Sequence, residues 1–176
     1  MRHVPNIAAA VALVGCAAPA AASNAVATLE IVGQVSPRCS IDVQDDTIDR
    51  VLTDGPGSES VPFSVDCNQP LVVNMQSLNG GFLHESGRRL SGSPGFITFL
   101  PYTTTLKVDA AGASPITFQS EQMVAGATGS IGVTPFKAKG ELRLSWSPQS
   151  PLIGGAYRDI IEIRVSGEGE TSSTPI

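Results

Sequence analysis

The segment Ile161-Glu-Ile-Arg-Val165 alternates apolar and charged side chains with a period of two residues. This alternation predicts a β-strand with one buried face and one solvated face. Val61-Pro-Phe-Ser-Val-Asp-Cys67 repeats the pattern, and turn sequences such as Asn79-Gly-Gly81 separate the runs. Shorter runs of the same kind lie at 41–43, 71–76, 96–100, 106–108 and 142–146. We therefore expect an all-β, antiparallel, immunoglobulin-like β-sandwich of about seven short strands.

The composition favours a single turn-rich domain and disfavours a nucleic-acid-binding protein. Gly and Pro contribute 18 and 13 of the 176 residues, more than the roughly 12% of an average protein. The formal net charge is −5, and the 11 Lys and Arg residues are scattered along the chain. Binding to phosphate backbones requires clustered basic side chains, so we expect no nucleic-acid partner.

Residues 1–22 have the organisation of a secretory signal peptide. Arg2 provides the early positive charge, residues 7–22 are uncharged and rich in Ala, and Ala20 and Ala22 precede the predicted cleavage site. We expect an exported protein whose mature chain begins at Ser23. Leu13-Val-Gly-Cys16 also matches the bacterial lipobox. In that alternative Cys16 is lipidated and the protein is a lipoprotein.

Removal of the signal peptide with Cys16 leaves two cysteines, Cys39 and Cys67. An even pair in an oxidising compartment predicts a disulfide bond, with two buried free thiols as the less common alternative. Neither cysteine has a second Cys or a His two to four positions away, which disfavours a zinc site. We expect no metal and no cofactor.

The remaining chemistry-bearing residues do not form a catalytic pattern. His84 follows a Gly-rich turn and is interpreted as a loop residue, and no G-x-S-x-G motif is present. The acidic segment 42–49 lacks the central Gly of an EF-hand, so we interpret it as a solvated loop. Trp146 ends an alternating run and is expected in the core. The sequence thus predicts a protein that is not an enzyme and takes no small-molecule substrate.

Five motifs in order give the chain a resemblance to a known family. From about Ala25 to Val165 it resembles the spore coat protein U domain family, the subunit type of archaic chaperone–usher pili. The turn motif formed by Gly155, Tyr157 and Asp159, just before the final alternating run, is the most specific part of the resemblance. The motifs are Val35-Ser-Pro-Arg-Cys39, Val61-Pro-Phe-Ser-Val-Asp-Cys67, Leu71-Val-Val-Asn-Met75, Leu100-Pro-Tyr102 with Leu106-Lys-Val-Asp-Ala-Ala-Gly112, and Gly155-Ala-Tyr-Arg-Asp159.

Three features differ from the usual pattern of that family. Members usually have a Gly-Thr-Tyr form where this chain has Gly155-Ala-Tyr157, and a Tyr-rich strand where it has Tyr102-Thr-Thr-Thr-Leu106. An additional tail, residues 167–176, follows the last strand and is expected to be flexible because it is rich in Gly, Ser and Thr.

The resemblance implies an incomplete, pilin-type sandwich that lacks one strand. A periplasmic chaperone then lends a strand to the subunit, and at an usher the N-terminal extension of the next subunit replaces it. The result is a head-to-tail polymer of the chain with itself, a fimbrium at the cell surface that serves cell adhesion. The contact is a β-augmentation, in which main-chain hydrogen bonds supply affinity and alternate side chains fill pockets.

Residues 23–35 are the predicted donor-strand extension, and the sandwich domain is expected over 36–166. Within the extension Ala25, Ala27, Leu29 and Ile31 form one apolar face that grows in size along the chain. In the alternative interpretation, residues 25–31 pair within their own sheet. The protein is then a self-complete extracellular β-sandwich, acting as a binding module or as a lipid-anchored envelope protein.

Overall fold

A computed structural model describes residues 29–45, 47–90 and 95–169. The chain divides into two units, residues 1–34 and residues 35–176. Residues 29–34, the described part of the first unit, belong to no strand. The predicted signal peptide, Cys16, and the first two donor residues, Ala25 and Ala27, lie outside the described residues.

The second unit contains a five-stranded antiparallel sheet in the order β1-β2-β9-β6-β7. Its long central pair, β2 and β9, is joined by a continuous ladder from Gly57 opposite Trp146 to Val65 opposite Ala138. The strands are β1 (Cys39–Val43), β2 (Gly57–Cys67), β6 (Tyr102–Val108), β7 (Ile116–Gln119) and β9 (Ala138–Trp146).

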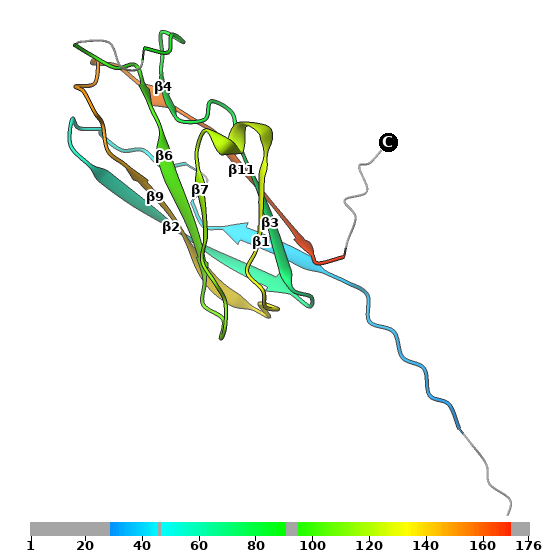
Figure 1. The fold of residues 1–176 in the computed structure, drawn as a ribbon. Helices are drawn as coiled ribbons and strands as arrows, with labels where there is room; N and C mark the ends of the chain where they lie inside the picture. The colour runs from blue at the N-terminus through cyan, green and yellow to red at the C-terminus, as the bar shows by residue number, and fades with distance from the viewer. Residues whose placement is uncertain (1–28, 46, 91–94, 170–176) are drawn as a thin grey trace, which may run out of the picture. The chain divides into compact units, whose positions relative to one another are not determined.

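Two three-stranded sheets complete the strand inventory of the described residues. One has the order β11-β3-β8, and the other has the order β10-β4-β5. Figure 1 shows β3 and β11 behind the strands of the five-stranded sheet. The elements are β3 (Leu71–Ser77), β4 (Phe82–His84), β5 (Phe99–Leu100), β8 (Ala127–Ser130), β10 (Tyr157–Arg158), β11 (Ile161–Gly167) and a single 3₁₀ turn, η1 (Gln122–Ala125).

The core lies between the sheets and is built from alternate residues of the long strands. Every second side chain of β2, β3, β6 and β9 points inward because successive residues of a strand face opposite sides of the sheet. The all-β antiparallel sandwich predicted from the sequence is therefore confirmed. The inward residues of these strands are Val61, Phe63, Val65 and Cys67; Leu71, Val73 and Met75; Tyr102, Leu106 and Val108; and Ala138, Leu142 and Leu144.

The structure corrects two details of the sequence interpretation. The strand expected over 106–108 begins at Tyr102, because Thr104 is also buried and its hydroxyl hydrogen-bonds the carbonyl of Phe118 at 3.3 Å. His84 is not a loop residue, since it ends β4 and is buried. Within the described ranges, no helix has the length and apolar content needed to cross a bilayer.

The predicted disulfide between Cys39 and Cys67 is present. The two residues lie directly opposite each other in the β1–β2 ladder, with their Cα atoms 4.1 Å apart. The bond therefore fastens the edge strand β1 to the central part of the five-stranded sheet, and it closes a sequence separation of 28 residues.

Replacing both cysteines, Cys39→Ala with Cys67→Ala, should lower the free energy of unfolding by about 3.5 kcal/mol, because the unfolded chain regains the entropy of an open loop. Urea unfolding followed by far-ultraviolet circular dichroism measures this change. The wild-type protein in excess reductant is the control and should unfold at the midpoint of the double variant. An unchanged midpoint would contradict a stabilising role for the bond.

Candidate functional site

Two edge strands of different sheets lie against each other without pairing. β1 ends the five-stranded sheet, and β11 ends the sheet that it forms with β3 and β8. The two strands are in contact, yet no ladder joins them. Among the strands of the described residues, none pairs with the outer edge of β11 over residues 161–166. We call this contact between β1 and β11 the open seam.

The side chains of the open seam are apolar but incompletely covered. The inward residues of β3, such as Val73 and Met75, are fully buried. Those of β11 lie directly opposite them on the same face, but they are only half-buried. The sandwich is thus closed along β3 and incompletely closed along the open seam. The half-buried apolar side chains of the open seam are Cys39 and Ile41 from β1, and Ile161, Ile163 and Val165 from β11.

The opposite face of β11 is polar. Glu162 and Arg164 are exposed and form an ion pair, with the guanidinium Nη2 of Arg164 2.8 Å from the Glu162 carboxylate. Charged residues on an edge strand discourage indiscriminate pairing with other sheets. A strand added beside β11 would therefore present apolar side chains inward, toward the core, and polar side chains outward.

A small pocket of about 60 Å³ lies between the segment that follows β1, the beginning of β2 and the end of β9. The indole of Trp146 covers the beginning of β2 there, where a Cβ at Gly57 would lie 2.6 Å from the indole ring. The half-buried ring of Phe82 packs edge-on against Trp146, with ring centroids 5.5 Å apart. The pocket is lined by Ile48, Arg50, Leu52, Glu59, Phe82, Leu144, Trp146 and Tyr157.

The carboxylate of Asp159, just before β11, is the acceptor of five hydrogen bonds. Two come from hydroxyl groups, those of Ser77 and Tyr102, each at 2.6 Å. Three come from backbone N–H groups, those of Asn79 at 2.9 Å, Gly81 at 3.1 Å and Ile160 at 2.8 Å. These contacts, the Asp159 node, join the end of β3, the following turn, β6 and the start of β11.

The donor side chains of the Asp159 node are buried, which makes the node structurally important. Ser77 and Tyr102 are each 2% exposed. Burial raises the pKa of Tyr102 far above its usual range, and the hydrogen bond to Asp159 raises it further. Its hydroxyl therefore keeps its proton and remains a donor to the carboxylate. Hydrogen bonds to a charged acceptor are stronger than neutral ones, so the node fixes the position at which β11 begins.

The other two residues of the predicted turn motif have local roles. Gly155 has a φ of +149°, and a Cβ there would overlap the imidazole of His84. Tyr157 lies in β10, with its hydroxyl 2.9 Å from the carbonyl oxygen of Ile97 and 3.0 Å from that of Ile153. The motif residues therefore lie in the segment that leads into β11, and each makes a different contact.

The predicted donor residues are described only in part. Leu29 and Ile31 are 82% and 86% exposed and belong to no strand. The next apolar residue, Val32, is 82% exposed. The described part of the extension thus offers uncovered apolar side chains.

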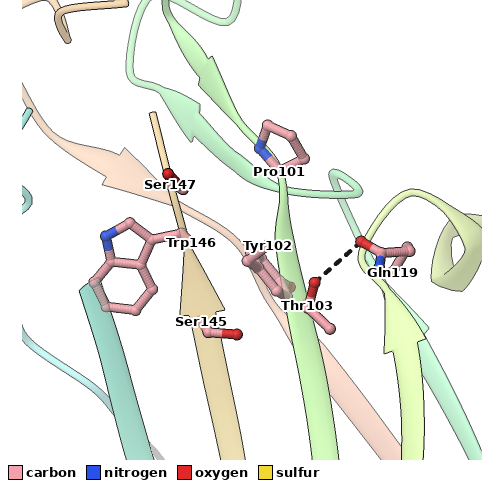
Figure 2. A pocket seen from close by; sticks show the side chains of 7 residues that line it. All are labelled: Pro101, Tyr102, Thr103, Gln119, Ser145, Trp146 and Ser147. Carbon is pink, nitrogen blue, oxygen red and sulfur yellow. Dashed lines mark hydrogen bonds between the residues drawn. The ribbon is translucent and has the colours of Figure 1, made fainter. Parts of the chain in front are cut away.

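A second hollow, of about 270 Å³, lies on the outer face of the five-stranded sheet. Figure 2 shows Thr103, Gln119 and Ser145 around it, with the Thr103 hydroxyl donating to the Gln119 side-chain oxygen at 3.1 Å. No charged side chain lines this hollow. In the described parts of the chain, no three metal-ligating side chains are grouped together either.

Sequence reasoning missed two features: the hydrogen-bond partners of Asp159, and the segment of residues 48–52 that lines the small pocket. Ser77 and Tyr102 are 82 and 57 positions away from Asp159 in the sequence, so no local spacing pattern predicts the node. A local signal did exist for the pocket, since Ile48, Arg50 and Leu52 alternate along the chain. This signal was hidden because the acidic residues beside it suggested only a solvated loop.

Replacing Asp159 with Ala should lower the free energy of unfolding by about 3 kcal/mol or more, because buried donors lose a charged acceptor. Tyr102→Phe removes one of the five bonds and should cost about 1–2 kcal/mol. Asp109→Asn is the matched control, since Asp109 is exposed and should stay within about 0.5 kcal/mol of wild type. Chemical denaturation measures all three. Equal stability of the Asp159 and Asp109 variants would contradict a role for the node.

Stability should fall as the pH rises above about 10, the ordinary pKa of tyrosine in the unfolded chain. Burial raises the pKa of both tyrosines of the chain, Tyr102 and Tyr157, in the folded state. The unfolded chain therefore loses protons first, and alkali favours unfolding. A spectrophotometric titration of tyrosinate should show ionisation only together with loss of structure. Ionisation of both tyrosines in a fully folded protein near the ordinary pKa would contradict this.

No family model matches the chain, and no curated protein matches it. Among solved structures, the chain is similar to one in the crystal structure of the CsuC–CsuE chaperone–tip adhesion subunit pre-assembly complex from archaic chaperone–usher Csu pili of Acinetobacter baumannii. The aligned chains are 18% identical with a TM-score of 0.35, and the alignment covers 75% of this chain. It covers 40% of that chain, so the protein spans less than half the length of its structural neighbour.

Proposed function

We propose that the protein is a non-catalytic structural subunit of a chaperone–usher type pilus or surface coat, which assembles by donor-strand complementation. The observation that carries the proposal is the open seam. There an apolar row of half-buried side chains lies beside the unpaired edge of β11. The proposal rests on this edge and not on the likeness to the Csu complex.

The occupant that we propose for the open seam is the segment 25–31 of a second copy. An added strand satisfies the backbone N–H and C=O groups of the β11 edge, and its alternate side chains cover the apolar row. The segment contains seven residues, a span of about 23 Å in an extended strand, and the open edge of β11 extends over residues 161–166. The segment is therefore long enough to cover that edge.

The exposure of the extension supports donation to a neighbour. Leu29 and Ile31 are almost fully exposed, and large exposed apolar side chains in series usually mark an interaction site. The contact is heterologous, because the donor segment and the open seam are different surfaces of one chain. Such a contact propagates as a filament instead of closing into a dimer.

The proposal includes a route to the cell surface. Export depends on the signal peptide predicted at residues 1–22, and a periplasmic chaperone covers the open seam until an usher passes the subunit to the fibre. Lipidation of Cys16 would tether the segment that has to enter a neighbour, so we propose cleavage after Ala22. In the runner-up function, the same domain is a self-complete binding module or envelope protein.

Replacing Ile31 with Asp should abolish polymer formation, because a carboxylate would enter the apolar seam of the next subunit without a partner. Val32→Asp is the matched control, since Val32 is equally exposed and lies on the other face of the alternating segment. Both variants should keep the thermal stability of the wild-type subunit. Multi-angle light scattering and non-reducing, unboiled gel electrophoresis would detect polymers.

The result that contradicts the proposal is polymer formation by the Ile31→Asp variant at the wild-type level. A wild-type protein that stays monomeric at high concentration, with residues 25–31 protected from hydrogen exchange, would instead favour the self-complete module.

A further inference from the structure

Residues 47–53 form an extended strap over the pocket beyond the open seam. Ile48, Arg50 and Leu52 all line that pocket, although the strap belongs to no strand. Side chains of every second residue point to one side only when the backbone is extended. The strap therefore presents every second side chain to the pocket, as a β-strand would.

The strap lies at the end of the open seam. It follows β1 in the chain, and Arg50 reaches Glu59 of β2. Below it lie the half-buried Trp146 and Tyr157, the latter just before β11. The strap thus covers apolar side chains that continue the row of the open seam past the last residue of β1.

Exposed polar contacts hold the strap in place. Arg50 donates two hydrogen bonds to the Glu59 carboxylate, at 2.6 and 2.9 Å. At the far end, the Asp54 carboxylate accepts a hydrogen bond from the backbone N–H of Leu152 at 2.8 Å. Exposed ion pairs of this kind contribute little to stability and are screened by salt. The ion pair between Arg50 and Glu59 is therefore easily broken.

The apolar contribution of the strap is also incomplete. Ile48 remains 42% exposed and Val51 is 90% exposed. The pocket that remains beneath the strap has a volume of only about 60 Å³. A further large side chain does not fit there while Ile48 and Leu52 occupy their positions.

We propose that the strap, residues 47–53, is a built-in plug that fills the far end of the open seam in the isolated subunit and has to swing out before the donor segment of a second copy can occupy that end. The inference rests on the proposed function and adds a regulatory step to it. The ion pair between Arg50 and Glu59 is the latch of the plug. Loss of this latch speeds donor entry.

Trp146 is a natural reporter of the strap, because it is the single tryptophan of the chain and it lines the pocket. Arg50→Glu places two carboxylates against each other and should release the strap without disturbing the core, since the substituted side chain, that of Arg50, is 60% exposed. Acrylamide quenching of Trp146 fluorescence should then increase. The charge reversal Arg50→Glu with Glu59→Arg restores an ion pair and should return the quenching to the wild-type value.

Donor entry is measured with a fluorescein-labelled synthetic peptide of residues 23–33, added to the full chain. All proteins in this assay carry Ile31→Asp, so that their own extensions do not compete. Fluorescence anisotropy follows peptide uptake. The reference is the background protein, which carries Ile31→Asp alone. We expect Arg50→Glu to accelerate peptide uptake about threefold or more relative to it. The charge-reversed pair should take up the peptide at the rate of the background protein.

The outcomes separate the plug from the proposed function. Equal or slower uptake by the Arg50→Glu protein, or unchanged quenching of Trp146, overturns the plug and leaves the proposed function standing. Absence of peptide uptake in every protein, including the background protein, overturns the proposed function and the plug with it. A third outcome is that Arg50→Glu accelerates uptake but the charge-reversed pair does not restore the rate of the background protein. This outcome overturns the role of the ion pair as the latch.

Discussion

The unpaired edge of β11 is the constraint on which the remaining organisation depends. A strand edge presents backbone N–H and C=O groups that bind water until another strand replaces it. Here the edge lies beside an apolar row that is only half-buried. An unpaired backbone edge alone, or a half-buried apolar row alone, is compatible with a stable domain. Together they favour the binding of an extended segment with alternating apolar side chains. The proposed donor segment, the proposed plug and the polar outer face of β11 are each consistent with a role at this single edge.

A sandwich with an unpaired edge strand needs other contacts that keep this edge in position. At one end of β1, the disulfide to Cys67 fastens this strand to its sheet. At the start of β11, the Asp159 node fastens the chain to β3 and to Tyr102 of β6. Both devices act at the margins of the open seam and leave its apolar interior available. A pre-formed seam would need little further ordering when the proposed donor strand binds.

Most of the long strands and the disulfide could be predicted from the sequence, because both depend on local patterns, whereas the Thr-rich β6 was predicted only over residues 106–108. Alternation over five or more residues marks β2, β3, β9 and β11, and the parity of the mature cysteines marks the bond. The strands β4, β7, β8 and β10 have two to four residues and no clear alternation, so only pairing with distant neighbours defines them. The Asp159 node escaped prediction for the same reason, since its partners are brought together by the sandwich. His84 was misread because the adjacent Gly-rich turn outweighed a three-residue strand.

Hydrogen exchange along β11 tests the central claim most directly. The subunit with Ile31→Asp is measured alone and then saturated with the synthetic peptide of residues 23–33. If the sandwich is completed by a second copy, backbone amides on the free edge over residues 161–166 exchange rapidly in the subunit alone and become protected with the peptide, while those of β3 stay protected in both states. Full protection of β11 without the peptide, or exchange that the peptide does not alter, would contradict an unfinished sandwich.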